Sequence, residues 1–251
     1  MIKERLRIPT TAGHTLSAEL DLPDTGSPGM VALFAHCFTC GKNLKFILSL
    51  SRHLGEAGIA VLRFDFTGLG NSEGDFRDTN FSSNVSDILD VADFMASRNQ
   101  APELLIGHSL GGAAILHAAG NINSAKCAAV IAAPFDRDHV LQIFDHLRSD
   151  IAEKGEATFS LGGTVFTVNE NFFEKGEFDT VKILQTLELP LLIIHSPEDE
   201  TVDIDHGRRL YDAMAGPKRL ELLQGADHLL SNETHIMKTA DLISDWAGQH
   251  A

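Results

Sequence analysis

The sequence of 251 residues lacks the features that mark secreted and membrane proteins. It has three cysteines, Cys37, Cys40 and Cys127, and this small, odd number disfavours a disulfide framework. No stretch approaches the roughly 18 consecutive apolar residues of a membrane span, and the amino-terminal segment has no apolar core of the kind that a secretory signal needs. These absences predict a soluble, cytoplasmic protein.

Basic residues are also scarce. The sequence has 20 Lys and Arg and 35 Asp and Glu, which gives a formal net charge of −15. Proteins that bind phosphate backbones or anionic membranes need clustered Lys and Arg. The composition therefore disfavours nucleic acid and membrane partners. The remaining composition, 43% hydrophobic and 22% charged, is that of an ordinary globular domain long enough to bury a large core.

Apolar runs alternate with amphipathic segments along most of the chain. Strand-like runs cover residues 3–10, 15–23, 30–36, 59–66, 103–109, 126–134, 190–196 and 218–225. Helical spacing covers residues 44–58, 82–98, 110–120, 204–216 and 233–248, with Ser82 or Ser83 expected to start the second helix. Continuously apolar strands are typical of a parallel sheet covered on both faces, whereas the first three strands lack intervening helices. The pattern predicts an α/β fold with a mostly parallel eight-stranded sheet and helices on both faces.

Residues 135–187 interrupt this alternation. They contain a helical stretch over 138–155 and a hairpin-like stretch over 157–169 that turns at Gly162 and Gly163. Roughly fifty residues are too many for an ordinary connection between two core strands. We therefore predict a small inserted cap at 135–187 on a core formed by 1–134 and 188–251.

The pentapeptide Gly107-His108-Ser109-Leu110-Gly111 lies between a buried strand and a helix. This G-x-S-x-G pattern is typical of a serine nucleophile on a sharp strand-to-helix turn, where glycines avoid clashes and the helix amino terminus favours negative charge. The pattern predicts Ser109 as the nucleophile. The alternative is a glycine-rich turn that carries an inert serine.

A serine nucleophile needs a histidine base and an acid that orients it, and on this kind of fold they follow in the order Ser, Asp or Glu, His. Glu198, Asp199 and Glu200 follow the strand at 190–196, so the residues alone leave three candidate acids open. His228 follows the last strand and is the candidate base, and the adjacent Asp227 is interpreted as a local loop partner.

Together these motifs resemble the α/β-hydrolase superfamily. The matching segments are GHSLGG at 107–112, HSPEDETV at 195–202, GADHLL at 225–230 and RFDFTGLGNSEG at 63–74. The second is similar to the family's HGxxDxxV, which implies that Asp199 is the acid. More narrowly, HCFTC and FDFTGLGNSEGDF resemble bacterial hydrolases that are often fused to an osmotically-inducible-protein-C-like domain, although no such domain follows before Ala251.

The resemblance also implies an oxyanion hole made by the backbone N–H groups of Phe38 and Leu110. Phe38 lies in the stretch FAHCFTCGKN at 34–43, and Cys37 stands where the family usually has glycine, which would put a thiol near the acyl group. His108, Cys37, Phe144 and Phe173 are further predicted to contact the substrate.

The leading interpretation is a carboxylesterase-type serine hydrolase that cleaves short-to-medium acyl or aromatic esters through an acyl-enzyme. Ser109, His228 and Asp199 would form the triad, with no metal or organic cofactor, in a monomer or homodimer. A thioesterase or a peptidase or amidase could use the same residues. More distant alternatives are a redox or metal protein that uses the Cys-x-x-Cys pair, and a binding protein without catalysis.

Overall fold

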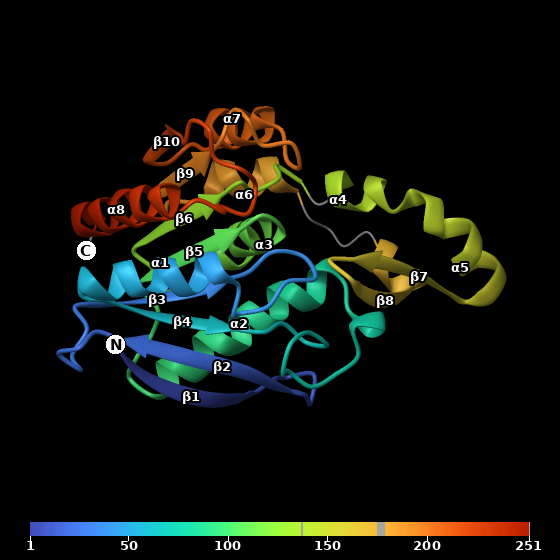
Figure 1. Ribbon diagram of the computed structural model, residues 1–251, viewed down its shortest axis with the longest axis horizontal. Helices are drawn as coiled ribbons and strands as arrows, with labels where there is room; N and C mark the ends of the chain where they lie inside the picture. The colour runs from blue at the N-terminus through green and yellow to red at the C-terminus, as the bar shows by residue number, and fades with distance from the viewer. Residues whose placement is uncertain (137, 175–178, 251) are drawn as a thin grey trace.

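The computed structural model describes residues 1–136, 138–174 and 179–250, and an eight-stranded sheet runs through its centre (Figure 1). The sheet has the order β1-β2-β4-β3-β5-β6-β9-β10. Its strands are β1 (Ile2–Pro9), β2 (Thr15–Leu22), β3 (Met30–Ala35), β4 (Ile59–Phe64), β5 (Leu104–His108), β6 (Cys127–Ile131), β9 (Leu191–His195) and β10 (Lys218–Leu222). β2 is antiparallel to β1 and β4, and the other neighbouring strands are parallel. The predicted α/β fold with a mostly parallel eight-stranded sheet is confirmed.

Helices cover both faces of this sheet, which explains why β3, β4, β5, β6 and β9 are buried along their whole length. α1 (Lys45–Glu56) and α8 (Glu233–His250) bury their apolar stripes against one face. α2 (Phe81–Ser97), α3 (Leu110–Ala119) and α7 (Ile204–Ala213) pack on the other face. Because parallel strands all end at the same edge, the loops after β3, β5, β9 and β10 can converge there.

The start of α2 differs from the prediction, because Asn80 rather than Ser82 or Ser83 is its N-cap. Asn80 Oδ1 accepts the backbone N–H of Ser83 at 2.9 Å, and Ser83 Oγ accepts the backbone N–H of Asn80 at 3.0 Å. Ser83 therefore belongs to the first turn and completes a reciprocal capping box.

The segment between β6 and β9 projects from the sheet in Figure 1. It contains α4 (Asp138–Ile143), α5 (Arg148–Lys154), β7 (Glu156–Leu161), β8 (Thr164–Asn169) and α6 (Thr180–Thr186). The predicted hairpin is confirmed, and its turn uses Gly162 and Gly163 at φ values of 59° and 82°, which favour glycine. α6 differs from the rest because it packs on α3 and α7 and buries Leu184 in the main core. This packing places α6 with the core, whereas the predicted extent of an inserted cap at 135–187 stays a prediction.

Candidate active site

Ser109 occupies the sharp turn between β5 and α3. Its φ of 53° and ψ of −127° lie in a region that side-chain-bearing residues avoid, and its N–H donates to Ile131 O at 2.9 Å. A Cβ added at Gly107 would come within 2.5 Å of Gly112 Cα, and one at Gly111 within 2.3 Å of His36 O. The glycines of the G-x-S-x-G pattern are thus required by close backbone approaches on both sides of the serine.

Three of the predicted side chains meet in one chain of hydrogen bonds. His228 Nε2 lies 3.0 Å from Ser109 Oγ, and His228 Nδ1 lies 2.8 Å from Asp199 Oδ2. The other oxygen of Asp199, Oδ1, accepts the backbone N–H groups of Thr201 at 2.9 Å and Val202 at 3.0 Å. Since an ionised carboxylate only accepts hydrogen bonds, Nδ1 carries the imidazole proton and Nε2 is free to accept the proton of Ser109.

The local environment keeps Asp199 ionised and gives it hydrogen-bond partners that differ from those of the neighbouring acids. Burial raises the pKa of Asp199, but the hydrogen bonds from His228 and from the Val202 and Thr201 N–H groups lower this pKa by more. Glu198 instead accepts the N–H of Gly225 at 2.9 Å, and Asp227 accepts the N–H of Ser231 at 2.8 Å. Of the acids near this turn and loop, Asp199 is thus the one bonded to the histidine.

His108 was predicted to contact the substrate, and the structure contradicts this. The side chain is completely buried, and its Nε2 donates to the backbone carbonyl of His228 at 2.7 Å. Burial, reinforced by the charge of His228, lowers the pKa of His108 to about 3, so the ring is neutral near pH 7. His108 therefore supports the loop that carries His228.

The buried neutral ring of His108 makes stability depend on pH. Its pKa is about 3 in the fold against an ordinary value of 6.5, so its contribution is complete above pH 6.5 and is lost as the pH falls toward 3. We expect His108→Gln, which keeps an N–H donor, to reduce the slope of unfolding free energy against pH by about 1.4 kcal/mol per pH unit between about pH 4 and 6. Urea denaturation at a series of pH values measures this slope. An unchanged slope would contradict the expectation.

The loop after β3 holds the peptide that contains the Phe38 N–H. Cys37 O accepts two hydrogen bonds, from His36 Nδ1 at 2.8 Å and from the Cys40 N–H at 3.2 Å. Because Cys37 C=O and Phe38 N–H belong to one planar peptide unit, fixing the carbonyl also fixes the direction of the N–H. Burial lowers the pKa of His36 to about 4, so this ring is also neutral near pH 7.

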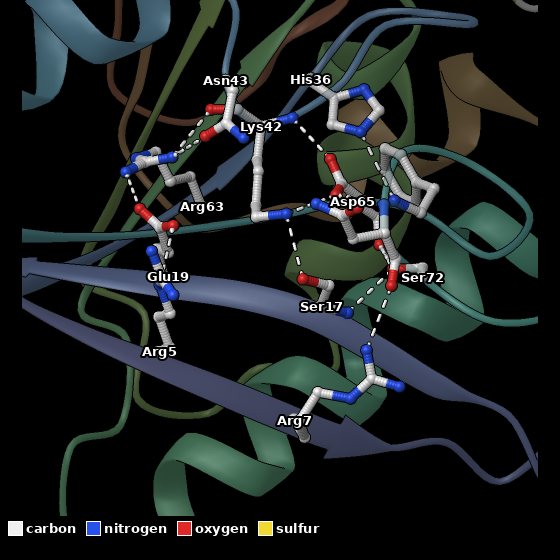
Figure 2. A network of polar contacts seen from close by, with 12 residues as sticks. Arg5, Arg7, Ser17, Glu19, His36, Lys42, Asn43, Arg63, Asp65 and Ser72 are labelled. Atoms are coloured by element: carbon white, nitrogen blue, oxygen red, sulfur yellow. Dashed lines mark hydrogen bonds and ion pairs between the residues drawn. The ribbon is translucent and has the colours of Figure 1, made fainter.

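Buried ion pairs anchor the far end of the same loop, and Figure 2 shows them. The backbone N–H of Lys42 donates to Asp65 Oδ1 at 2.7 Å. The ammonium group of Lys42 forms an ion pair with the same carboxylate and donates a hydrogen bond to Ser17 Oγ. Arg63 donates to Lys42 O at 3.1 Å and to Asn43 Oδ1 at 2.7 Å. Removing one member would leave a buried charge without its partner, which is strongly destabilising. Sequence reasoning missed this network, although a charged Arg63 inside an apolar strand was a visible signal.

Cys37 and Cys40 form a disulfide with a Cα–Cα distance of 5.4 Å, and Cys127 is free and buried. The prediction of a free thiol near the acyl group is therefore wrong. A count of three cysteines disfavours a disulfide framework but does not exclude a single local bridge. The bridge spans the turn that presents the Phe38 N–H, so it restrains the same peptide as His36.

The disulfide predicts how many thiols can be alkylated. Purified protein unfolded in denaturant without reductant should take up iodoacetamide at Cys127 alone, whereas prior reduction should expose all three cysteines. Intact-protein mass spectrometry counts the added groups. Three modified cysteines in the unreduced sample would contradict the bridge.

An apolar pocket begins at the two predicted oxyanion donors. Its wall includes Cys37, Phe38 and Leu110, together with Leu141 and Phe172 from the insertion. Cys37 thus lines the pocket as half of a disulfide, and its contact with a substrate stays a prediction.

Two predicted substrate contacts lie elsewhere. The Phe144 ring is buried in the core of the insertion and contacts the Phe38 ring at a centroid distance of 5.5 Å. The guanidinium carbon of Arg148 lies over the Phe173 ring, 3.9 Å from the ring centroid. Neither residue lines the pocket, so both predictions differ from the structure. The phenylalanine of the insertion that lines it is Phe172, the immediate neighbour of Phe173 in sequence.

The described part of the chain brings no three His, Cys, Asp or Glu side chains together in a group that could hold a metal ion. In particular, both sulfurs of the Cys-x-x-Cys pair are used in the disulfide. Among the helices within the described ranges, none has the length and apolar character needed to cross a membrane.

Known proteins resemble this chain in sequence and in fold. The profile of the alpha/beta hydrolase family matches residues 32–242. The crystal structure of the esterase domain from a Rhodothermus marinus protein is 38% identical, covers 100% of this chain and 99% of that chain, and superimposes with a TM-score of 0.80. Est1E from Butyrivibrio proteoclasticus with bound ferulic acid is 20% identical, with 98% of each chain covered and a TM-score of 0.82. Human mitochondrial palmitoyl-protein thioesterase ABHD10 is 24% identical over 229 residues, which cover 87% of this chain and 72% of the human protein.

Proposed function

The chain belongs to the alpha/beta hydrolase family and is a hydrolase, and on this premise we propose that it cleaves carboxylic esters with a Ser109-His228-Asp199 triad. The observation that supports the proposal is the unbroken chain of hydrogen bonds from Asp199 through His228 to Ser109 Oγ. A serine on a strained turn, with a base and an oriented acid at these distances, is the arrangement that acyl transfer requires.

In the proposed mechanism, Ser109 Oγ attacks the ester carbonyl and His228 Nε2 takes its proton. Asp199 holds the ring and stabilises the imidazolium that forms. The backbone N–H groups of Phe38 and Leu110 donate to the tetrahedral oxyanion. His228 then protonates the leaving alcohol. In the second half of the reaction, His228 takes a proton from a water molecule that attacks the acyl-enzyme, and it returns this proton to Ser109 Oγ as the acid is released.

The insertion is proposed to act as a cap over this site. The ring of Phe38, whose N–H is a proposed oxyanion donor, packs against Phe144, Phe159 and Phe172 of the insertion at centroid distances of 5.5, 6.1 and 5.8 Å. The apolar pocket, whose wall includes Phe38 and Phe172, supports short-to-medium acyl or aromatic esters as substrates. A cytoplasmic location and a monomeric or homodimeric state stay predictions.

A thioester is the second candidate substrate. The sequence similarity to palmitoyl-protein thioesterase ABHD10 favours it, and the same triad chemistry serves esters and thioesters. The two differ in the leaving group, an alcohol or a thiol. Matched oxygen and sulfur esters of the same acyl group therefore separate these candidates.

The proposed function is tested with a fluorophosphonate probe and a set of p-nitrophenyl esters from acetate to decanoate. We expect covalent labelling of the peptide that contains Ser109, and the highest kcat/KM at short or medium chains. Matched S-acyl substrates complete the comparison. Absence of labelling at Ser109 together with no ester or thioester turnover would overturn the proposal.

A further inference from the structure

His195 ends strand β9 and is a buried polar side chain that the proposed mechanism does not use. Residues 191–194 of this strand are apolar and completely buried, and His195 is 1% exposed. Its Nε2 donates to the backbone carbonyl of Val202 at 2.8 Å, and its Nδ1 has no hydrogen-bond partner within the described ranges. Burial lowers the pKa of His195, so the ring is neutral near pH 7. Because a buried nitrogen without a partner destabilises the fold, packing alone does not explain a histidine at this position.

The carbonyl that accepts this hydrogen bond belongs to the turn that holds the proposed triad acid. The N–H of Val202 donates to Asp199 Oδ1 at 3.0 Å, so the two backbone groups of Val202 are bonded to the carboxylate and to His195. The other carboxylate oxygen, Oδ2, lies 2.8 Å from His228 Nδ1 but 3.9 Å from His195 Nε2, which is too far for a hydrogen bond. His195 therefore acts on the acid through Val202 and does not compete with His228.

Helix α7 packs against the other side of the His195 ring. A Cβ added at Gly207 of this helix would lie 2.8 Å from His195 Nδ1 and 3.2 Å from its Cβ and Cγ, and both residues are buried. The first distance is shorter than van der Waals packing allows, and a ring in a close-packed interior has no free space into which to move. Gly207 therefore leaves the space that the ring needs to reach Val202 O, although alanine would be the better helix former.

From these contacts we propose, resting on the proposed triad, that His195 is a positioning residue for Asp199. By holding the Val202 carbonyl it fixes the turn that carries the carboxylate, and the carboxylate in turn orients His228. His108 makes the equivalent contact at the end of β5, where its Nε2 donates to the backbone carbonyl of His228 at 2.7 Å. The acid and the base are thus each held by a buried histidine that is not part of the triad.

The test compares kcat and KM for p-nitrophenyl acetate in three variants of His195. His195→Leu removes the N–H donor and lets the acid shift, so we expect kcat to fall by roughly 10- to 100-fold while KM stays nearly unchanged. His195→Gln can place an amide N–H near the position of Nε2 and should keep kcat within about threefold of the wild type. The shorter side chain of His195→Asn does not reach Val202 O, so this variant should resemble His195→Leu.

A double variant separates positioning of the acid from general support of the fold. If His195 acts through Asp199, adding His195→Leu to Asp199→Asn should cause no further loss of kcat, whereas a residue that only supports the fold would lower the activity of both backgrounds. Gly207→Ala displaces the same ring from the helix side and should lower kcat by roughly tenfold. Gly248→Ala in α8, where the structure leaves open space for the added Cβ, is the matched control and should keep the wild-type kcat.

The outcomes separate this inference from the function on which it rests. If Ser109 is labelled and p-nitrophenyl esters are cleaved, but folded His195→Leu keeps the wild-type kcat or its loss multiplies with that of Asp199→Asn, the inference is overturned and the esterase function stands. A loss in His195→Gln as large as that in His195→Leu would overturn it too. If Ser109 is not labelled and no ester is cleaved, the function itself fails. Circular dichroism verifies folding, and if His195→Leu does not fold, an unchanged kcat in Gly207→Ala overturns the inference.

Discussion

Ser109→Ala is expected to lower kcat/KM for every ester substrate by about 10⁴-fold or more. The substitution removes the one oxygen that lies 3.0 Å from His228 Nε2 and leaves the backbone N–H groups of Phe38 and Leu110 in place. Any residual rate would come from the oxyanion hole and from substrate binding alone. Hydrolysis of p-nitrophenyl acetate and labelling by the fluorophosphonate probe measure the loss.

A second substitution at the same position separates catalysis from stability. Ser109→Ala would keep a side chain at the unfavourable φ of 53°, whereas Ser109→Gly relieves this strain. The glycine variant should therefore be as inactive as the alanine variant but more stable by about 1 kcal/mol. Ser97→Ala, at an exposed helix end, is the control for loss of a serine hydroxyl. Activity retained in either Ser109 variant would show that another residue is the nucleophile.

Much of the fold was predictable because its signals are local. Continuous apolar runs identified the buried strands, and a Gly-Gly pair between two alternating segments identified the β7–β8 hairpin. The placement of Ser109, Asp199 and His228 after three strands of the parallel part of the sheet, β5, β9 and β10, was also enough to bring them to one edge, since the ends of parallel strands meet there.

Features that depend on contacts between distant segments were not predictable. His108 does not line the pocket but is buried and bonded to the His228 carbonyl, a contact between residues 120 positions apart. Phe172, rather than its neighbour Phe173, lines the pocket because a short 3-10 helix turns one ring toward Phe38 and the other toward Arg148. A spacing pattern alone contains no information on either arrangement.

The Cys37–Cys40 bridge shows a further limit of prediction from the sequence. The sequence spacing is compatible with a disulfide, a redox pair, half a metal site or two free thiols. The turn between the two residues brings the sulfurs together, with the Cys40 N–H donating back to Cys37 O at 3.2 Å. The choice between these chemistries thus depended on the backbone path and not on the residue types.

Asp199→Asn is expected to reduce kcat by about 10⁴-fold while changing KM little. The Oδ1 atom of Asp199 accepts two backbone N–H groups, so an asparagine oxygen must occupy that position. Its amide nitrogen then faces His228 Nδ1 in place of the carboxylate oxygen now at 2.8 Å. Because that nitrogen donates, it selects the tautomer in which Nε2 carries the proton and cannot accept the proton of Ser109.

The matched control for this substitution is Asp227→Asn. Asp227 is adjacent to His228 in sequence, but its carboxylate accepts the N–H of Ser231 at 2.8 Å, a bond that an asparagine oxygen can keep. Its replacement should leave kcat close to the wild-type value, because no hydrogen bond joins it to the imidazole in the described site. Steady-state kinetics with p-nitrophenyl acetate compares the two variants. A large loss in Asp227→Asn with a small loss in Asp199→Asn would move the role of the acid to Asp227, whereas equal small losses would mean that His228 needs no carboxylate to accept the serine proton.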